Sequence, residues 1–535
     1  MVWVQAVSEL KMMKEGTGNQ QVAIQQGAIE LRAAIHIGAS SISMLVTSAA
    51  EGSEGEQIEY LEKSTSLAHD IFRNEEISKP TIERCVETVN GYLAVLLELG
   101  VQADHPSIRI VASNIVAEAS NKNIFTNRLL IGCGVPVEVL DDGEMTRLIY
   151  LKTRRRLHDT PVMLKRNTLV VHAGPGTTRV LYFQKGKIAS YNSYRIGTSR
   201  VGEEARDGFD DSRKVQKVMR EEIHTHLETL LEDYAEEDVQ EVVLIGYEIQ
   251  LMSQHIPGLK DSRCSVENLD HFCDAFARLD DDTAVAKFHL RYRTTESILP
   301  ALLINLCIAQ ALNLEAVHIS ASDYERGLLL DLHQSETASN DFSEEVGGSA
   351  WALAKKFRVN KKHAKNVSRL ALKLFDDLQE LHLLGEHDRL LLHCAALLHE
   401  SGGFISQVAH HKHSQYLILH SDIFGLSSSD ISLVALLTRY HRNSPPKQNH
   451  ALYRDLDTAQ QIRVSKIASL LRIADALERT HSGRISDFDI RITKKKMHLH
   501  LHGITDASVE RLAMRSKGNL FQNIFGLEIN LEEER

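Results

Sequence analysis

The sequence predicts two α/β domains, followed by an all-α domain and a small α+β segment at the C-terminus. Two apolar hairpin patterns, each followed by alternating strand and helix patterns, predict the α/β part in residues 31–334. After residue 350 the apolar residues change to helical spacing, and after residue 485 they alternate again as in strands. A chain of 535 residues agrees with three or four domains of roughly 100–200 residues each.

These changes in pattern divide the chain into six expected regions. Residues 335–349 read SETASNDFSEEVGGS, which is polar, acidic and glycine-containing and is therefore typical of a linker. The full division is an N-terminal extension (1–30), a first α/β domain (31–160), a second α/β domain (161–334), the linker (335–349), the helical domain (350–485) and the C-terminal segment (486–535).

The composition excludes several classes of protein. With 43% hydrophobic residues and a net charge of −11, the chain is globular and mildly acidic, which argues against disorder and against general nucleic-acid binding. Its six cysteines are scattered without a C-x-x-C pair, as is typical of reduced thiols. The apolar stretch 301–312 contains Asn305 and Gln310 and is too short to span a membrane. We expect a cytoplasmic protein with neither a membrane nor a nucleic acid as partner.

Two short segments of the α/β part share one pattern. They read AAIHIGASSISMLV (residues 33–46) and LVVHAGPGTTRVLYF (residues 169–183). Each is an apolar strand, then His-x-Gly-x-x-Ser/Thr, then a run in which apolar and polar residues alternate, which predicts a hairpin with a tight glycine turn. Such a turn can direct backbone N–H groups toward a phosphate.

The rest of the chain shows two other periodicities. Three- and four-residue spacing predicts one buried helix face, formed by Val367, Leu370, Ala371, Leu374, Phe375, Leu378 and Leu381. Further on, residues 488–493 and the run from Met497 predict a hairpin around residues 494–496 that leads into a short helix. The second strand of this hairpin places on an exposed face the residues His498, His500 and His502.

Five segments, taken in order, resemble the motifs of one protein family. The two hairpin segments are similar to its phosphate loops, A-x-D-[IL]-G-S-N-S and D-I-G-G-G-S-T-E. Three further segments match later motifs: RIVASNIVAEASNKNIF (109–125), DDGEMTRLIYL (141–151) and ASDYERGLLLDL (321–332). The chain thus resembles, over residues 31–535, the Ppx/GppA family of exopolyphosphatases and guanosine pentaphosphate phosphohydrolases.

The resemblance carries expectations about fold and activity. It implies duplicated actin-like (ribonuclease H-like) domains, followed by an all-α HD-like domain and the small α+β piece. It also implies a magnesium-dependent hydrolase that removes terminal phosphates from polyphosphate or guanosine polyphosphate. We further expect a homodimer.

The departures from the family pattern fall at its acidic positions. His36, Met145, His172 and Arg179 stand where the family has carboxylates, and Glu144 lies one residue before its expected place. Magnesium prefers oxygen ligands, and a catalytic acid or base typically contributes about 10²–10⁴-fold of rate, so we expect impaired catalysis. The loops are still candidates for phosphate binding, through Gly38, Ser40, Ser41, Gly174, Gly176, Thr177, Thr178 and Arg179.

The resemblance places two more candidate sites in the helical domain. HD domains hold one or two metal ions with histidines and carboxylates at the centre of a helix bundle, which here indicates His363, His399, Glu400 and Asp475. A local excess of cationic groups is a candidate polyanion site, formed by Lys412, Arg439, His441 and Arg442.

Three functions remain open from the sequence. The first is an impaired enzyme that binds polyphosphate or nucleotide anions, or has a regulatory role. The second is an active phosphohydrolase that uses either an altered actin-like site or a metal-dependent HD-like site. The third is a dimeric scaffold without a ligand.

Overall fold

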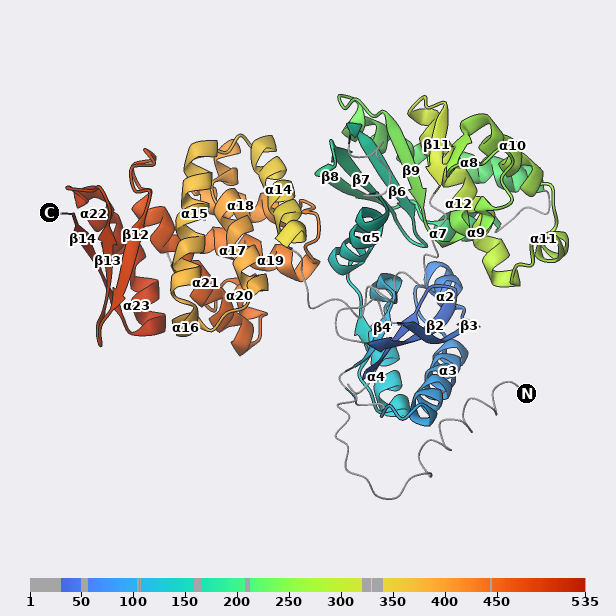
Figure 1. The fold of residues 1–535 in the computed structure, drawn as a ribbon, viewed down its shortest axis with the longest axis horizontal. Helices are drawn as coiled ribbons and strands as arrows, with labels where there is room; N and C mark the ends of the chain where they lie inside the picture. Colours follow the sequence, from blue (N-terminus) through green and yellow to red (C-terminus); the bar gives the residue numbers. More distant parts are fainter. Residues whose placement is uncertain are drawn as a thin grey trace, which may run out of the picture.

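The computed structural model describes residues 30–49, 56–102, 105, 107–157, 165–206, 212–319, 329, 340–442 and 445–534. Most of the expected N-terminal extension and nearly all of the segment 321–332 lie outside these residues. Figure 1 shows two α/β units, drawn in blue to yellow-green, and a helix bundle with a small sheet, drawn in yellow to red.

The first α/β unit is built on a five-stranded sheet that contains the first predicted hairpin. Strands β1 and β2 pair antiparallel, and β1 also pairs parallel with β4, as the hairpin and βαβ patterns predicted. Residues 33–39 are all buried, because β1 lies in the middle of the sheet. In spatial order the strands are β3 (Glu56–Ser64), β2 (Ser41–Ala49), β1 (Glu30–Ile37), β4 (Ile108–Ala112) and β5 (Glu138–Val139). Four helical segments accompany them: α2 (Leu67–Asn74), α3 (Lys79–Glu98), η1 (Asn114–Glu118) and α4 (Lys122–Cys133).

The second α/β unit repeats this arrangement on a six-stranded sheet. Its central hairpin, β6–β7, is antiparallel, and β6 pairs parallel with β9. In both units a third strand, β3 or β8, extends the hairpin; the sequence analysis did not predict it. The spatial order is β10 (Arg263–Ser265), β11 (Ala316–Ile319), β9 (Glu241–Ile245), β6 (Thr168–Ala173), β7 (Thr178–Gln184) and β8 (Lys187–Tyr194). The helices are α7 (Thr198–Arg206), α8 (Ser212–Tyr234), α9 (Tyr247–Ser253), α10 (Val266–Phe276), α11 (Asp281–Phe288) and α12 (Tyr292–Ala311).

Helix α12 is the apolar core helix of the second unit. Among the described residues, its stretch Thr294–Ala311 is the one helical segment with the length and composition to cross a membrane, but 78% of that stretch is buried inside the fold. Asn305 within it donates a hydrogen bond from Nδ2 to the carbonyl of Ala301 at 2.8 Å. This burial is typical of the core helix of an α/β fold.

Part of the expected linker is helical, so that expectation was wrong. Helix α14 (Asn340–Lys356) includes residues 340–349. Phe342, Val346 and Ala350 are buried at four-residue spacing, which forms an apolar stripe within a segment that is otherwise polar. The Phe342 ring packs against Tyr150 of α5 (Asp142–Leu157) at 5.8 Å between centroids. Tertiary contact therefore orders a segment whose composition indicated a loop.

The helical domain follows, and its predicted apolar face is confirmed on α15. Val367, Leu370 and Leu374 are buried there, as are Ala371 and Phe375. Of the two remaining predicted positions, Leu378 is buried but follows the last residue of the helix, and Leu381 lies in the next helix and is only partly buried. Asn360 starts this helix by accepting backbone N–H bonds at its side-chain oxygen. The remaining helices are α15 (Lys361–Asp377), α16 (Gln379–His382), α17 (Glu386–Leu398), η2 (Ser401–Phe404), α18 (His410–Leu419), α19 (Ser428–Tyr440), α20 (Ala451–Arg454) and α21 (Thr458–Leu477).

The chain ends in a three-stranded sheet with two helices. The predicted hairpin is confirmed as β12 (Phe488–Ile492) and β13 (Lys496–Leu501), with Ile492 opposite Met497. A further strand, β14 (Glu528–Glu533), pairs parallel with β13 and was not predicted. His498 of β13 is only partly exposed, and its Nδ1 lies 2.7 Å from Oε1 of Glu532 in β14. Helices α22 (Ser508–Lys517) and α23 (Asn519–Phe525) complete this part.

Candidate functional site

The two glycine-turn hairpins meet at a small cavity of about 60 Å³. His36 near the end of β1 and His172 near the end of β6 both line it, at equivalent positions of the two units. Met145 of α5 and Arg179 of β7 line the same cavity. The structure thus brings together all four positions at which the sequence lacks an expected carboxylate.

The two turns are tight, which explains their first glycines. The N–H of Gly38 donates to the carbonyl of Ser41 at 2.8 Å, and that of Gly174 donates to Thr177 at 3.0 Å. A Cβ at Gly38 would lie 2.9 Å from the Ser41 oxygen, too close for any side chain at this position. Each turn is therefore held by its own backbone.

Only half of the predicted phosphate-loop residues line the cavity. Those that do are Ser40, Ser41, Gly174 and Arg179, whereas Gly38, Gly176, Thr177 and Thr178 are not among its lining residues. The Thr178 hydroxyl donates to the carbonyl of Ile196 at 2.6 Å and is fully buried, because it serves the packing of the sheet. The prediction for these four residues therefore has no support in the geometry.

Arg179 is a buried cationic residue that lines the cavity. It is only 2% exposed, and its Nη2 lies 2.5 Å from the Oδ1 of Asp142. Asp142 also accepts a hydrogen bond from Asn114 Nδ2 at 2.9 Å. Since Asn114 lies in η1, Asp142 in α5 and Arg179 in β7, this polar chain joins the two α/β units across the cavity.

Glu144 does not supply the missing carboxylate. It forms ion pairs with Arg147 at 2.6 Å and with Arg109 at 3.5 Å, and it lines a different cavity of about 590 Å³. Although burial opposes ionisation, the two guanidinium groups hold the pKa of Glu144 below its usual value. Consecutive residues of a helix point in different directions, so only Met145 faces the hairpins.

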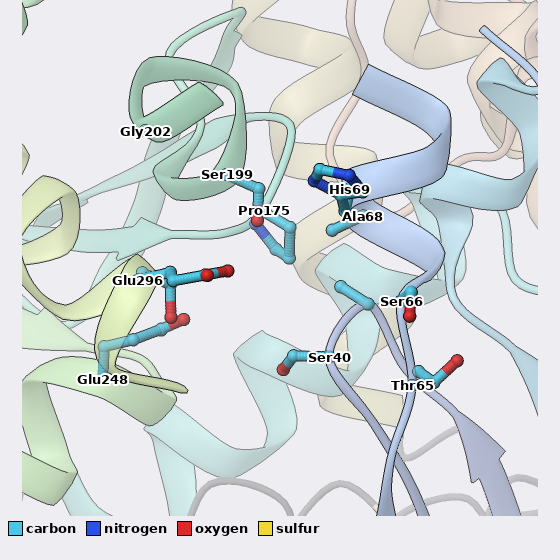
Figure 2. A pocket seen from close by; sticks show the side chains of 12 residues that line it. Ser40, Thr65, Ser66, Ala68, His69, Pro175, Ser199, Gly202, Glu248 and Glu296 are labelled. Carbon is cyan, nitrogen blue, oxygen red and sulfur yellow. The ribbon is translucent and has the colours of Figure 1, made fainter. Parts of the chain in front are cut away.

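Two carboxylates that the sequence analysis missed lie in the adjoining pocket. Figure 2 shows Glu248 and Glu296 on one side of it, facing Ser40, Ser66 and His69 on the other. Glu248 lines both this pocket and the cavity with the two histidines, and it is 9% exposed. It follows β9 by three residues, at the carboxyl end of a parallel strand, where ligands of open α/β sheets bind. That position is the signal that could have identified it.

Ion pairs also join side chains of the two units. Arg200 of α7 pairs with Glu118 of η1 at 2.7 Å, and its guanidinium lies 5.0 Å from the centre of the Phe72 ring. Arg291 forms a second bridge between the units, to Glu62 at 3.0 Å. These contacts favour a closed arrangement of the two units.

The helical domain brings together the four residues predicted as metal ligands. His363 and His399 are fully buried, with their Nε2 atoms 3.3 Å apart, and Glu400 Oε2 lies 3.8 Å from His363 Nε2. Asp475 is close enough to form a set with the two histidines, in which all ligand atoms lie within 4.8 Å. His481, which the sequence analysis missed, forms a second such set with His363 and Glu400.

The predicted polyanion site is only partly assembled. His441 is 2% exposed, and burial lowers its pKa well below the ordinary value, so it is a neutral core residue and the prediction of a cation there was wrong. Lys412 is exposed, whereas Arg439 donates to Gln415 at 2.7 Å and Arg442 contacts His410 at 3.4 Å. Three of the four residues therefore carry positive charge at or near the surface.

Comparison with known proteins agrees with the resemblance. The profile of the Ppx/GppA phosphatase family matches residues 45–336, and that of Ppx/GppA phosphatase, domain III, matches residues 348–515. Two similar curated proteins are guanosine-5'-triphosphate,3'-diphosphate pyrophosphatases. The one from Photobacterium profundum is 23% identical over 483 residues, covering 88% of this chain and 91% of the relative. The one from Vibrio vulnificus is 24% identical over 448 residues, covering 80% and 84%.

Solved structures of similar proteins cover more than half of the chain. A Ppx/GppA protein of Aquifex aeolicus is 19% identical and covers 58% of this chain and 100% of its own, with a TM-score of 0.44. An exopolyphosphatase from Cytophaga hutchinsonii is 15% identical and covers 57% and 98%, with a TM-score of 0.48.

Proposed function

The chain belongs to the Ppx/GppA phosphatase family, and we propose that it binds polyphosphate or a guanosine polyphosphate between its two α/β units but hydrolyses it poorly. The curated relatives are named for a guanosine polyphosphate substrate, which supports this ligand class. A cytoplasmic location and a homodimer stay predictions.

Arg179 is the observation that carries the proposal. A guanidinium offers five N–H donors in a planar fork, which suits phosphate oxygens. Arg179 lines the cavity beside both turns, and its partner Asp142 has a side chain that is 56% exposed. Because Asp142 is open to water, it can turn away when a phosphate takes its place, and the buried positive charge stays paired.

At the four positions where the family has carboxylates, the same site lacks the acidic groups that the family's reaction uses. Attack of water on a terminal phosphate requires a group that orients the water and cations that offset the negative charge. The family's magnesium ion prefers oxygen ligands, and the imidazoles of His36 and His172 do not fit it. Arg179 can offset charge but cannot accept a proton from water. We therefore expect binding to persist and hydrolysis to be slow.

Glu248 favours a second candidate, an active hydrolase with a relocated acidic group. Its carboxylate lines the cavity that also contains Arg179 and the two histidines, and Glu296 lines the adjoining pocket. A carboxylate in this position can orient a water molecule or accept its proton. This candidate predicts that any hydrolysis depends on Glu248.

Binding is tested by titration of the chain with polyphosphate of defined length and with guanosine pentaphosphate. Charge-assisted hydrogen bonds contribute about 1.5–3 kcal/mol, so Arg179→Gln should weaken binding by about tenfold or more. Lys187→Gln is the matched control, because it removes one exposed positive charge at the start of β8, and Lys187 does not line the cavity. Equal affinities of the two variants would contradict the role of Arg179.

Catalysis is tested by phosphate release with magnesium or manganese present. We expect a rate far below that of active relatives assayed in parallel. A comparable rate that survives in Glu248→Gln would refute both candidates, whereas a comparable rate lost in that variant would favour the relocated site.

A further inference from the structure

A group of imidazoles and carboxylates gathers at the centre of the helical domain, far along the chain from the phosphate loops. Its members come from different elements: His363 lies in the first turn of α15, His399 and Glu400 follow α17, and Asp475 lies in α21. His481 follows α21 in a loop, with a left-handed backbone conformation (φ 53°). The fold, rather than the order of residues, thus assembles this group.

Asp475 already has a cation. Its carboxylate pairs with the ammonium of Lys517 from α22, and both side chains are buried. The charge of Asp475 is therefore balanced by Lys517, and this carboxylate does not need a metal ion as its counter-ion.

The imidazoles, by contrast, direct ring nitrogen atoms toward each other. His363 and His399 are both fully buried, and the Nε2 atom of one faces that of the other. The Nδ1 of His399 lies 2.8 Å from the carbonyl of Ala396 and donates its proton there. This fixes the tautomer of His399, so that in the neutral ring the lone pair is on Nε2, which faces His363.

The spacing of these nitrogens suits one metal ion. The two Nε2 atoms are 3.3 Å apart. Two imidazoles bound to a tetrahedral ion at about 2.0–2.1 Å have their nitrogens roughly 3.3 Å apart, by simple geometry. Glu400 supplies an oxygen 3.8 Å from His363 Nε2 and, on its other side, an oxygen 4.0 Å from His481 Nε2.

His481 can complete the group. Its ring lies face to face with that of His363, with 3.7 Å between centroids, and its side chain is 41% exposed. A loop side chain with this exposure has the freedom to turn its Nε2 toward a common centre. A cavity of about 510 Å³ that Glu400 and His410 line, together with Arg358 and Asn360, gives an ion a path to the group.

We propose that His363, His399, Glu400 and His481 hold one divalent transition-metal ion, and that Lys517 replaces a cation at Asp475. Imidazole with one carboxylate is a donor set for zinc or cobalt rather than for magnesium. The site differs from the set expected from the sequence, because His481 takes the part assigned to Asp475. It is independent of the proposed phosphate site between the α/β units.

The test is cobalt binding by the full chain after treatment with a chelator and dialysis. We expect one equivalent of Co²⁺, with the visible absorption of a tetrahedral ion, and a rise of the melting temperature with metal. His481→Gln should weaken metal binding by about tenfold or more. Replacing a residue that only hydrogen-bonds to a metal ligand already lowers metal affinity by about 10–100-fold. His420→Gln is the matched control, because His420 is an exposed histidine of the same domain.

The outcomes separate clearly. Stoichiometric cobalt that is lost in His481→Gln and kept in His420→Gln supports the site. No stoichiometric binding overturns it, and so does binding that His481→Gln leaves unchanged, because the ion would then lie elsewhere. Because His481 is half-exposed, its replacement should leave the fold intact, and circular dichroism of the variant checks this.

Discussion

The buried pair of Asp475 and Lys517 gives a sharp prediction about stability. Asp475 lies in α21 and Lys517 in α22, so the pair joins the helical domain to the C-terminal part of the chain. Their side chains are 8% and 9% exposed. The perturbation is Asp475→Asn, which keeps the size of the side chain and removes its charge.

The expected loss comes from the cations left behind. Removing one partner of a buried ion pair costs about 3–5 kcal/mol, because the other charge remains buried. Here two cations, Lys517 and Arg472, lose a nearby negative charge. Burial lowers the pKa of Arg472 to about 10, and the charge of Asp475 offsets part of that effect. Arg472 is fully buried and donates to the carbonyl of Tyr440 at 3.1 Å. We therefore expect a loss of at least about 3 kcal/mol in the free energy of unfolding of this region.

The pH dependence has a definite sign. The folded pKa of Asp475 lies below its unfolded value, so its contribution is fully present above the unfolded pKa of about 3.9. It is lost as the pH falls below that value toward the folded pKa. The difference in stability between wild type and Asp475→Asn should be constant from about pH 5.5 to 8 and shrink below about pH 4.

Hydrogen exchange measured by mass spectrometry is the suitable assay, because it reports on α21 and α22 separately from the α/β units. Asp455→Asn is the control, since Asp455 belongs to the same domain and its side chain is 64% exposed. A loss below about 1 kcal/mol, the upper size of an exposed pair, would refute the reasoning. A difference that does not change between pH 6 and pH 3.5 would contradict the ionised state of Asp475.

Three further predictions concern other contacts. Gly143→Ala should destabilise the packing of α5 on the helical domain by about 1–3 kcal/mol, because the added Cβ would lie 2.3 Å from the backbone nitrogen of Ser427, just before α19. A lower melting temperature would show this loss. The hydrogen bond from His387 to Asp430, at 2.7 Å, raises the pKa of His387. The stability lost in His387→Gln should therefore be greatest below about pH 6.5 and should disappear as the pH rises above the pKa of His387 in the folded protein. Unfolding in urea at a series of pH values measures this. Arg200→Ala removes the pair with Glu118 and should favour opening of the two α/β units by roughly twofold to fivefold, seen as a larger radius of gyration in X-ray scattering; an unchanged radius would contradict the bridging role.

Local pattern was sufficient for the hairpins and for the apolar faces of the helices. In β13 the alternation of side chains decides which residues are buried, whereas β1 and β6 are apolar runs that are buried almost throughout. The helix face on α15 follows from its spacing. The strands β3, β8 and β14 were missed because they lie at sheet edges or are short and polar, so burial leaves a weaker signal there. Helix α14 was missed for the opposite reason, since its apolar stripe is hidden among acidic and glycine residues.

The sequence by itself determined the family and the order of the α/β, helical and C-terminal regions. It also determined that His36, His172 and Arg179 replace carboxylates, because these features depend on residue identity and short-range periodicity. Only the tertiary structure decided which carboxylates face the phosphate loops and which histidines meet. Glu248 lies beside Arg179 and His481 beside His363 because separate elements pack together, while Glu144, one residue from Met145, points elsewhere. Side-chain direction depends on how helices and strands are placed in space, and a linear pattern does not contain that placement.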